Sequence, residues 1–199
     1  MFKSSKTLNN PQKGSFGYID YTKKKALITS ALSLASVLII FFTGVIIYNS
    51  NKSLFSIIAA VAAIPAAKLI TGYIVRVPYK TGDAKLYETL KAKSAKNAEY
   101  EAIIGADFII SSSSKSMGIT FAYIINGKVI CYTASNKTNT KETEKYIKEV
   151  FDNEGTQYSQ IKVYSDESKF LKNVDEVSTE KGKECTDKRI FEKLCVYSM

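Results

Sequence analysis

The chain contains no histidine and no tryptophan, and only three cysteines and three prolines among its 199 residues. Histidine is the commonest general base beside a catalytic serine or cysteine, so its absence excludes Ser-His and Cys-His pairs. A zinc site built from cysteine and histidine is excluded for the same reason. The composition therefore removes the most familiar nucleophilic and metal-binding arrangements, and we expect no catalytic residue, metal or cofactor of those kinds.

The three cysteines, Cys131, Cys185 and Cys195, are an odd number and show no Cys-x-x-Cys spacing. Their separations do not match a cysteine metal site. An odd number also argues against the disulfide framework of a small secreted domain. We expect buried or free thiols in a reducing compartment.

Two long apolar runs, 26–48 and 54–77, follow each other with only residues 49–53 between them. The first run carries no charge and would be about 34 Å long as a helix, enough to cross a hydrocarbon core of roughly 30 Å. The second is also long enough, although Lys68 and Arg76 interrupt it. Because the connection is so short, the sequence predicts an antiparallel transmembrane hairpin.

Charge on either side of the hairpin predicts its orientation. Residues 1–25 carry six lysines against one acid, Asp20, whereas the segment between the runs carries only Lys52. Lysine and arginine also follow the second run, and flanking basic residues stay on the cytoplasmic side. We therefore expect a bacterial plasma-membrane protein with both termini in the cytoplasm. A cleaved signal peptide fits poorly, because the charged lead is long and a second span follows at once.

The basic excess lies beside the expected membrane. Residues 1–96 hold 14 lysines and arginines against three acids, while residues 97–199 hold 14 against 16. Attraction to an anionic inner leaflet is worth about 1 kcal/mol per basic residue near the surface. The near-neutral remainder argues against a nucleic-acid footprint. The expected partners are an anionic lipid bilayer and a protein partner or a second copy of the chain.

Small residues line one side of each apolar run. Ala59, Ala63 and Ala67 recur every fourth residue in the second run, as Ala31 and Ala35 do in the first. Small residues at this spacing let helices approach closely in lipid. We read these alanines as a helix-packing face, used either within the hairpin or against another subunit.

Lys68 and Pro65 form a candidate intramembrane polar site. A charge inside a membrane segment is a functional candidate by default, but the long lysine stem also allows the ammonium to reach the interface. Pro65 removes one backbone hydrogen bond a turn earlier. Pairing or transport through Lys68 and simple snorkelling both stay open.

Three stretches carry a resemblance: residues 16–21 followed by lysines 23–25, residues 44–48, and residues 64–68. They resemble small uncharacterised membrane proteins of Firmicutes with two transmembrane helices, especially those of gut clostridia, over roughly residues 14–80. The resemblance implies a bacterial plasma membrane and assigns no activity.

The remainder predicts an α+β domain, with a mainly antiparallel sheet and packed helices, after a basic helical connector at 78–101 that Asp83 caps. Strands are expected at 102–112, with a bulge at Gly105, and at 118–125, 128–134 and 160–165. Asn126-Gly127 between the second and third is a strong hairpin signal. Helices are expected at 139–153, 168–177 and from Thr186, the last with residues 194–198 as an alternative edge strand.

Ser112, Lys115 and Asp107 form the one weak candidate site in this domain. Ser-x-x-Lys places a lysine beside a serine nucleophile in some acyl enzymes, but those need a buried helix start. Asp107 on a strand suggests metal chemistry, yet residues 118–134 contain no carboxylate to partner it.

The sequence thus predicts a basic segment (1–25), a hairpin (26–77), a connector (78–101) and a cytoplasmic domain (102–199). The expected function is a membrane-anchored, non-enzymatic interaction or regulatory module. A membrane-bound enzyme with an unrecognised site and a small oligomeric transport subunit are the alternatives.

Overall fold

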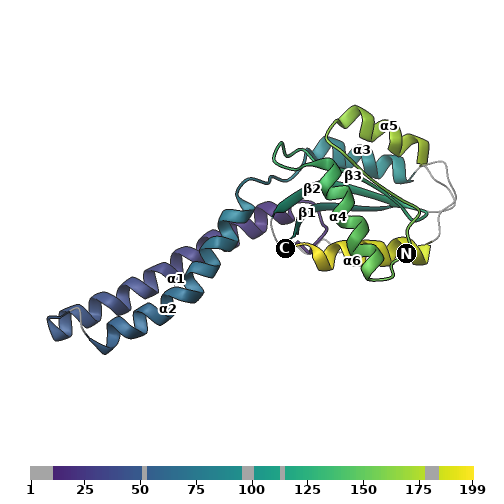
Figure 1. Ribbon diagram of the computed structural model, residues 1–199. Coiled ribbons are helices and arrows are strands. Elements are labelled where there is room, and N and C mark those ends of the chain that lie inside the picture. Colours follow the sequence, from purple (N-terminus) through teal and green to yellow (C-terminus); the bar gives the residue numbers. More distant parts are fainter. Residues whose placement is uncertain (1–10, 51–52, 96–100, 113–114, 178–183) are drawn as a thin grey trace. The chain divides into compact units, whose positions relative to one another are not determined.

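The computed structural model describes residues 11–50, 53–95, 101–112, 115–177 and 184–199, and it has an α+β architecture (Figure 1). The chain divides into two compact units. One unit is Asp20–Pro78, and the other joins the segment up to Ile19 with Tyr79–Met199. In sequence, the helical hairpin is therefore an insertion within the unit that contains the sheet.

The hairpin unit consists of most of α1 (Tyr18–Tyr48) and all of α2 (Leu54–Arg76). Both helices are long and apolar enough to cross a membrane by length and composition, as the sequence predicts. The first begins eight residues before the apolar run, because the lysine-rich segment continues the helix. The second ends one residue earlier than predicted.

The two helices of the hairpin meet through small side chains. A Cβ added at Gly44 would lie 2.4 Å from the Cβ of Phe55, so glycine is needed for this close approach. The Ser30 hydroxyl lies 3.4 Å from the carbonyl oxygen of Leu69. On α2, Ala59 and Ala66 are the buried alanines.

Only part of the helix-packing face predicted from the sequence is buried within the hairpin. Ala59 faces the partner helix of the hairpin, whereas Ala63 and Ala67 are exposed. Ala31 and Ala35 of α1 are exposed as well. Packing within the hairpin therefore follows a seam with a different spacing, and it leaves the other alanines on the outer surface.

The sheet has four strands in the order β1 (Ile103–Ser111), β2 (Ser116–Ile125), β3 (Lys128–Tyr132) and β4 (Gln160–Tyr164). The first three pair antiparallel, and β4 pairs parallel to β3. A parallel neighbour requires a crossover connection, which α4 (Thr140–Asn153) supplies. The sheet is mixed but mostly antiparallel, in agreement with the predicted fold class.

Helices cover both faces of the sheet (Figure 1). One core layer lies between the sheet and α4 with α6 (Glu184–Tyr197), and includes Phe108, Phe151 and Ile190. The second lies against α3 (Ala84–Ala95) and α5 (Glu167–Val177), and includes Leu90 and Phe170. This burial on both sides explains why β2 is a nearly continuous apolar run rather than an alternating one.

Local signals in the sequence place most element ends correctly. The Asn139 side chain accepts hydrogen bonds from the backbone N–H groups of Lys141 and Glu142 and caps α4. Asp83 accepts from the Lys85 N–H at the start of α3. Asn126 and Gly127 adopt φ values of 52° and 72°, which confirms the predicted tight hairpin.

Two local predictions are wrong. Gly105 is not a bulge, because it pairs in register with Ala122. Glycine is required there since a Cβ would lie 2.5 Å from the Phe108 ring. Thr186 does not cap the last helix, because α6 already begins at Glu184.

The C-terminal end combines the two alternatives that the sequence left open. The helix α6 continues to Tyr197, and Ser198 then forms an isolated antiparallel bridge with Ile110 of β1. The last residue donates its N–H to the carbonyl oxygen of Ile109 at 2.9 Å. The chain end therefore lies along the edge of β1.

Candidate functional site

Asp107 lies inside the sheet-containing unit and is 1% exposed. Its φ is 61°, an unusual value for a residue other than glycine. The Oδ2 atom accepts a hydrogen bond from the Thr81 hydroxyl at 2.9 Å and from the Ile19 N–H at 3.3 Å. These two donors precede and follow the inserted hairpin in sequence, so Asp107 holds the two chain segments that flank it.

A small apolar cluster surrounds these contacts. It consists of Ile19, Tyr79 and Ile109, with Met199 packed against them. The Tyr79 hydroxyl also donates to the carbonyl oxygen of Ser116 at 2.5 Å. Asp107 therefore has a structural environment, formed by segments from both ends of the chain.

Ser112 and Lys115 lie together at the turn between β1 and β2. The Ser112 N–H donates to the Lys115 carbonyl oxygen at 2.8 Å, and the Ser112 hydroxyl oxygen accepts from the Lys115 N–H at 3.3 Å. The Lys115 ammonium is 2.9 Å from a carboxylate oxygen of Glu142. The Lys115 ammonium is thus paired with an acid on α4. The two hydrogen bonds between Ser112 and Lys115 close the turn.

The Ser112–Lys115 turn borders an open hollow of about 240 Å³, together with Glu142, Tyr146 and other residues of α4. Asp107 is not among the residues that line this hollow. The structure therefore brings together two of the three residues of the weak candidate site and places the third elsewhere.

Lys68 and Pro65 are both exposed on the surface of α2. The helix continues through Pro65 without interruption. Arg76, near the end of the same helix, donates from Nη1 to the carbonyl oxygen of Gly72 at 2.6 Å. Lys68 is directed away from the seam of the hairpin, which leaves both of its predicted roles open.

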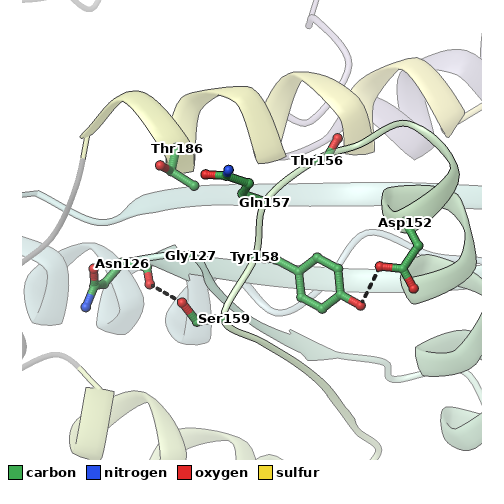
Figure 2. Close-up of a pocket in the computed structure, with 8 residues that line it drawn as sticks. All are labelled: Asn126, Gly127, Asp152, Thr156, Gln157, Tyr158, Ser159 and Thr186. Atoms are coloured by element: carbon green, nitrogen blue, oxygen red, sulfur yellow. Dashed lines mark hydrogen bonds between the residues drawn. The ribbon is translucent and has the colours of Figure 1, made fainter.

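The largest polar hollow of those described in the sheet-containing unit has a volume of about 670 Å³ (Figure 2). It lies where the β2–β3 turn, the end of α4, the α4–β4 loop and the first turn of α6 meet. The residues that line it are Asn126, Gly127, Asp152, Thr156, Gln157, Tyr158, Ser159 and Thr186. We call this the polar hollow.

Hydrogen bonds hold the wall of the polar hollow at the β2–β3 turn. Asp187 of α6 is fully buried, and its two carboxylate oxygens accept from the N–H groups of Gly127 at 2.6 Å and Asn126 at 2.7 Å. The Ser159 N–H donates to the Gly127 carbonyl oxygen at 2.8 Å. A Cβ at Gly127 would lie 2.9 Å from the Ser159 hydroxyl, so the loop approaches the turn very closely.

The opposite side of the polar hollow is formed by Tyr158 and Asp152. The Tyr158 hydroxyl donates to the Asp152 carboxylate at 3.0 Å, as Figure 2 shows. Burial, and then the hydrogen bond to Asp152, raise the pKa of Tyr158 above its usual value. The phenol therefore stays protonated at neutral pH and continues to donate.

Sequence reasoning used Asn126-Gly127 only as a turn and the stretch 154–159 only as a connection between elements. The polar character of residues 156–159 was visible in the sequence. What it could not reveal is that this stretch meets the β2–β3 turn and α6, which are distant along the chain.

The structure describes two of the three thiols, those of Cys131 and Cys195. Burial and then Glu144 raise the pKa of Cys131 to about 12, and burial raises the pKa of the free Cys195 thiol. The side chain of Cys185 lies outside the described residues. Within the described ranges, no three His, Cys, Asp or Glu residues are grouped so as to hold a metal ion.

Comparison with protein-family models, curated proteins and solved structures finds no match to this chain.

Proposed function

We propose that this is a bacterial plasma-membrane protein in which α1 and α2 anchor a small cytoplasmic interaction or regulatory domain. The observation that carries the proposal is the exposure of the two apolar helices. In each, only 11% of the most apolar window is buried. A water-soluble protein would bury helices of this composition, whereas lipid solvates them.

Large aliphatic side chains lie exposed along both helices, and those of α2 are representative. Leu54, Ile57, Val61 and Ile64 are between 63% and 72% exposed. At about 25 cal/mol per Å² of apolar surface, leaving such side chains in water is unfavourable by more than 1 kcal/mol each. Insertion into a bilayer removes this cost.

The orientation rests on the basic residues at the outer ends of the hairpin. Lys23, Lys24 and Lys25 lie on α1 before its apolar part, and Arg76 ends α2. The positive-inside rule assigns this end, and with it both termini, to the cytoplasm. An anionic inner leaflet strengthens the same arrangement.

The non-enzymatic assignment is supported by the candidate residues themselves. The Asp107 carboxylate accepts hydrogen bonds from the Thr81 hydroxyl and the Ile19 N–H, which is a structural role. The Lys115 ammonium pairs with Glu142 rather than activating a nucleophile. Tethering concentrates a domain near membrane partners without any new contact. The domain would therefore act through its location.

Cysteine labelling in intact cells tests the orientation. Ser50→Cys lies between the helices and Ser168→Cys lies on α5, and both positions are exposed. A membrane-impermeant maleimide is expected to label Ser50→Cys in intact cells and Ser168→Cys only after permeabilisation. Wild-type protein controls for Cys195, and the reverse labelling pattern would overturn the proposed topology.

A pull-down in mild detergent tests the interaction role. Because Ile19 and Tyr79 belong to one apolar cluster, residues 20–78 can be replaced by a short Gly/Ser linker without removing the segments that pack on the domain. If full-length and excised protein capture the same partner, the domain is the binding module. Loss of the partner from the excised form assigns binding to the hairpin instead.

Self-association through α2 is a second candidate. Ala63, Ala67 and Lys68 are exposed on this helix and unused by the hairpin seam. Small exposed residues allow a close helix–helix contact in lipid. Disulfide trapping of Ala63→Cys in native membranes, with Ile57→Cys as the control, would detect a second copy at that face.

A further inference from the structure

We infer that residues 11–17 form a strap over the edge of β1 and that an anionic lipid surface releases it. β1 lies at one edge of the described four-stranded sheet, and such an edge presents a row of unpaired backbone groups. The Gly14 carbonyl oxygen accepts from the Ala106 N–H at 2.9 Å, so the strap covers part of this edge. The inference rests on the proposed membrane anchoring, because the strap directly precedes the helix α1.

An ammonium group and an aromatic ring hold the strap closed. The Lys13 ammonium donates to the Ser198 carbonyl oxygen at 2.6 Å. The Phe16 ring stacks on the Tyr87 ring of α3, with the centroids 4.8 Å apart and the planes within 13°. It also lies parallel to the buried Phe121 ring of β2, at 6.4 Å between centroids. Releasing the strap would therefore uncover both the edge of β1 and an aromatic surface.

The strap has its own turn and a hinge at its end. The Ser15 N–H donates to the Gln12 carbonyl oxygen at 3.0 Å, which keeps the strap folded on itself. Gly17 has a φ of 86°, and a Cβ added there would meet nothing within 4 Å, so its backbone is free to turn. Just beyond this hinge, the Ile19 N–H is bound to Asp107. The strap can therefore swing about Gly17 while the start of α1 stays attached to β1.

The chemistry of Lys13 makes the strap sensitive to anionic lipid. Lys13 is exposed, and its ammonium donates to an uncharged acceptor, the Ser198 carbonyl oxygen. A lipid phosphate is a stronger acceptor, because both partners of the hydrogen bond are then ionised. An anionic bilayer also attracts each basic residue near its surface. Such a bilayer would therefore compete with Ser198 for the ammonium.

The released strap is long enough to make this exchange. Residues 18–25 of α1 precede the apolar run and span about 12 Å as a helix. The extended chain from Lys13 to Tyr18 reaches up to about 18 Å. A strap that swings about Gly17 can therefore bring Lys13 back to the surface that the apolar run enters.

Hydrogen exchange of single backbone amides tests the inference on the full-length protein in lipid nanodiscs. The Ala106 amide reports on the strap, because Gly14 is its acceptor, and the Ala122 amide of β2 is the internal reference. In an equal mixture of phosphatidylglycerol and phosphatidylcholine, Ala106 should exchange at least about fivefold faster than in phosphatidylcholine alone, the effect of one basic residue at an anionic surface. Ala122 should exchange equally in both. Salt at about 1 M should abolish the difference, because the Debye length is then about 3 Å.

Three variants locate the effect in the strap. Lys13→Gln keeps a donor for Ser198 but removes the charge, and it should lower the ratio of Ala106 rates between the two lipids about fivefold. Lys24→Gln removes an exposed lysine of α1 outside the strap and is the matched control, so the ratio should be unchanged. Phe16→Ala removes the stacked ring and should speed Ala106 exchange about tenfold in both lipids.

The inference is overturned if Ala106 exchanges at the same rate in both lipids, or only together with Ala122. Equal losses of the lipid effect in Lys13→Gln and Lys24→Gln would also overturn it, because the effect would then belong to the basic flank as a whole. A protein that does not insert into nanodiscs would contradict the proposed membrane anchoring and this inference with it, so the two failures are distinguishable.

Discussion

Replacing Asp107 tests whether one buried carboxylate holds the segments on either side of the hairpin. Asp107→Ala removes the acceptor of the Ile19 N–H and the Thr81 hydroxyl. Leaving a buried donor unsatisfied costs about 1–3 kcal/mol. Alanine also tolerates the positive φ poorly, at about 1–2 kcal/mol.

We therefore expect Asp107→Ala to lower the free energy of unfolding by about 2–5 kcal/mol. For a unit of this size, that loss corresponds to a fall in Tm of roughly 5–15 °C. Asp107→Asn should be much less harmful, because asparagine accepts one hydrogen bond and adopts positive φ readily. Asp107→Ala thus loses the acceptor and the tolerance of positive φ together, whereas Asp107→Asn keeps both.

Thermal unfolding followed by tyrosine near-ultraviolet circular dichroism measures the effect. Hydrogen exchange gives a local readout, and the Ile19 amide should exchange faster in Asp107→Ala. Asp175→Ala is the control, since Asp175 is an exposed partner of Lys93 and such pairs are worth about 0–1 kcal/mol. Equal stability of Asp107→Ala and wild type would refute the structural role of this carboxylate.

Three further predictions concern the hairpin, the β2–β3 turn and the response to alkaline pH. Gly44→Val should force the two hairpin helices apart because of the contact with Phe55, so crosslinking between cysteines placed on the two helices should fall. Gly72→Ala is the control and should not alter it, because its added Cβ meets only the end of the Arg76 side chain, at 3.2 Å. Asp187→Ala leaves two turn N–H groups without their acceptor and should destabilise the protein by about 2–4 kcal/mol in urea unfolding; an unchanged urea midpoint would contradict this. Burial, and then Asp175, raise the pKa of Tyr123 from 10.0 to about 12. The stabilisation that comes from this raised pKa of Tyr123 is complete below pH 10 and is lost as the pH rises to about 12. Tyr123→Phe should therefore flatten the decline of the unfolding free energy over that window.

The features that the sequence predicts well are those whose causes lie within a few neighbouring residues. Asn126-Gly127 specifies its own turn, and Asn139 caps the helix that follows it directly. The two apolar helices are also predicted well, because each is a continuous apolar run long enough to cross a bilayer.

The features that the sequence did not predict depend on contacts between distant segments. Asp107 meets Ile19 and Thr81 only after folding, so its structural role has no local signature. Gly105 was read as a bulge, although its real constraint is the Phe108 ring. The polar hollow is lined by residues from three separate stretches of the chain. The periodicity of apolar residues does not indicate which stretches lie side by side after folding.

Inserting the hairpin between two parts of one unit also sets an order of events during synthesis. The carbonyl oxygen of Gly14 accepts from the Ala106 N–H, and the Lys13 ammonium donates to the Ser198 carbonyl oxygen at 2.6 Å. Both hairpin helices leave the ribosome before the sheet, and Ser198 leaves after it. The segment around Lys13 and Gly14 must therefore wait until the hairpin, the sheet and α6 have been made before all of these contacts can form.

In that interval the antiparallel hairpin keeps the chain on its two sides close together. Closing a long flexible loop costs entropy that grows with its length, and a preformed hairpin of 59 residues removes most of that search. The hairpin would thus serve as a folding scaffold for the domain that surrounds it in sequence.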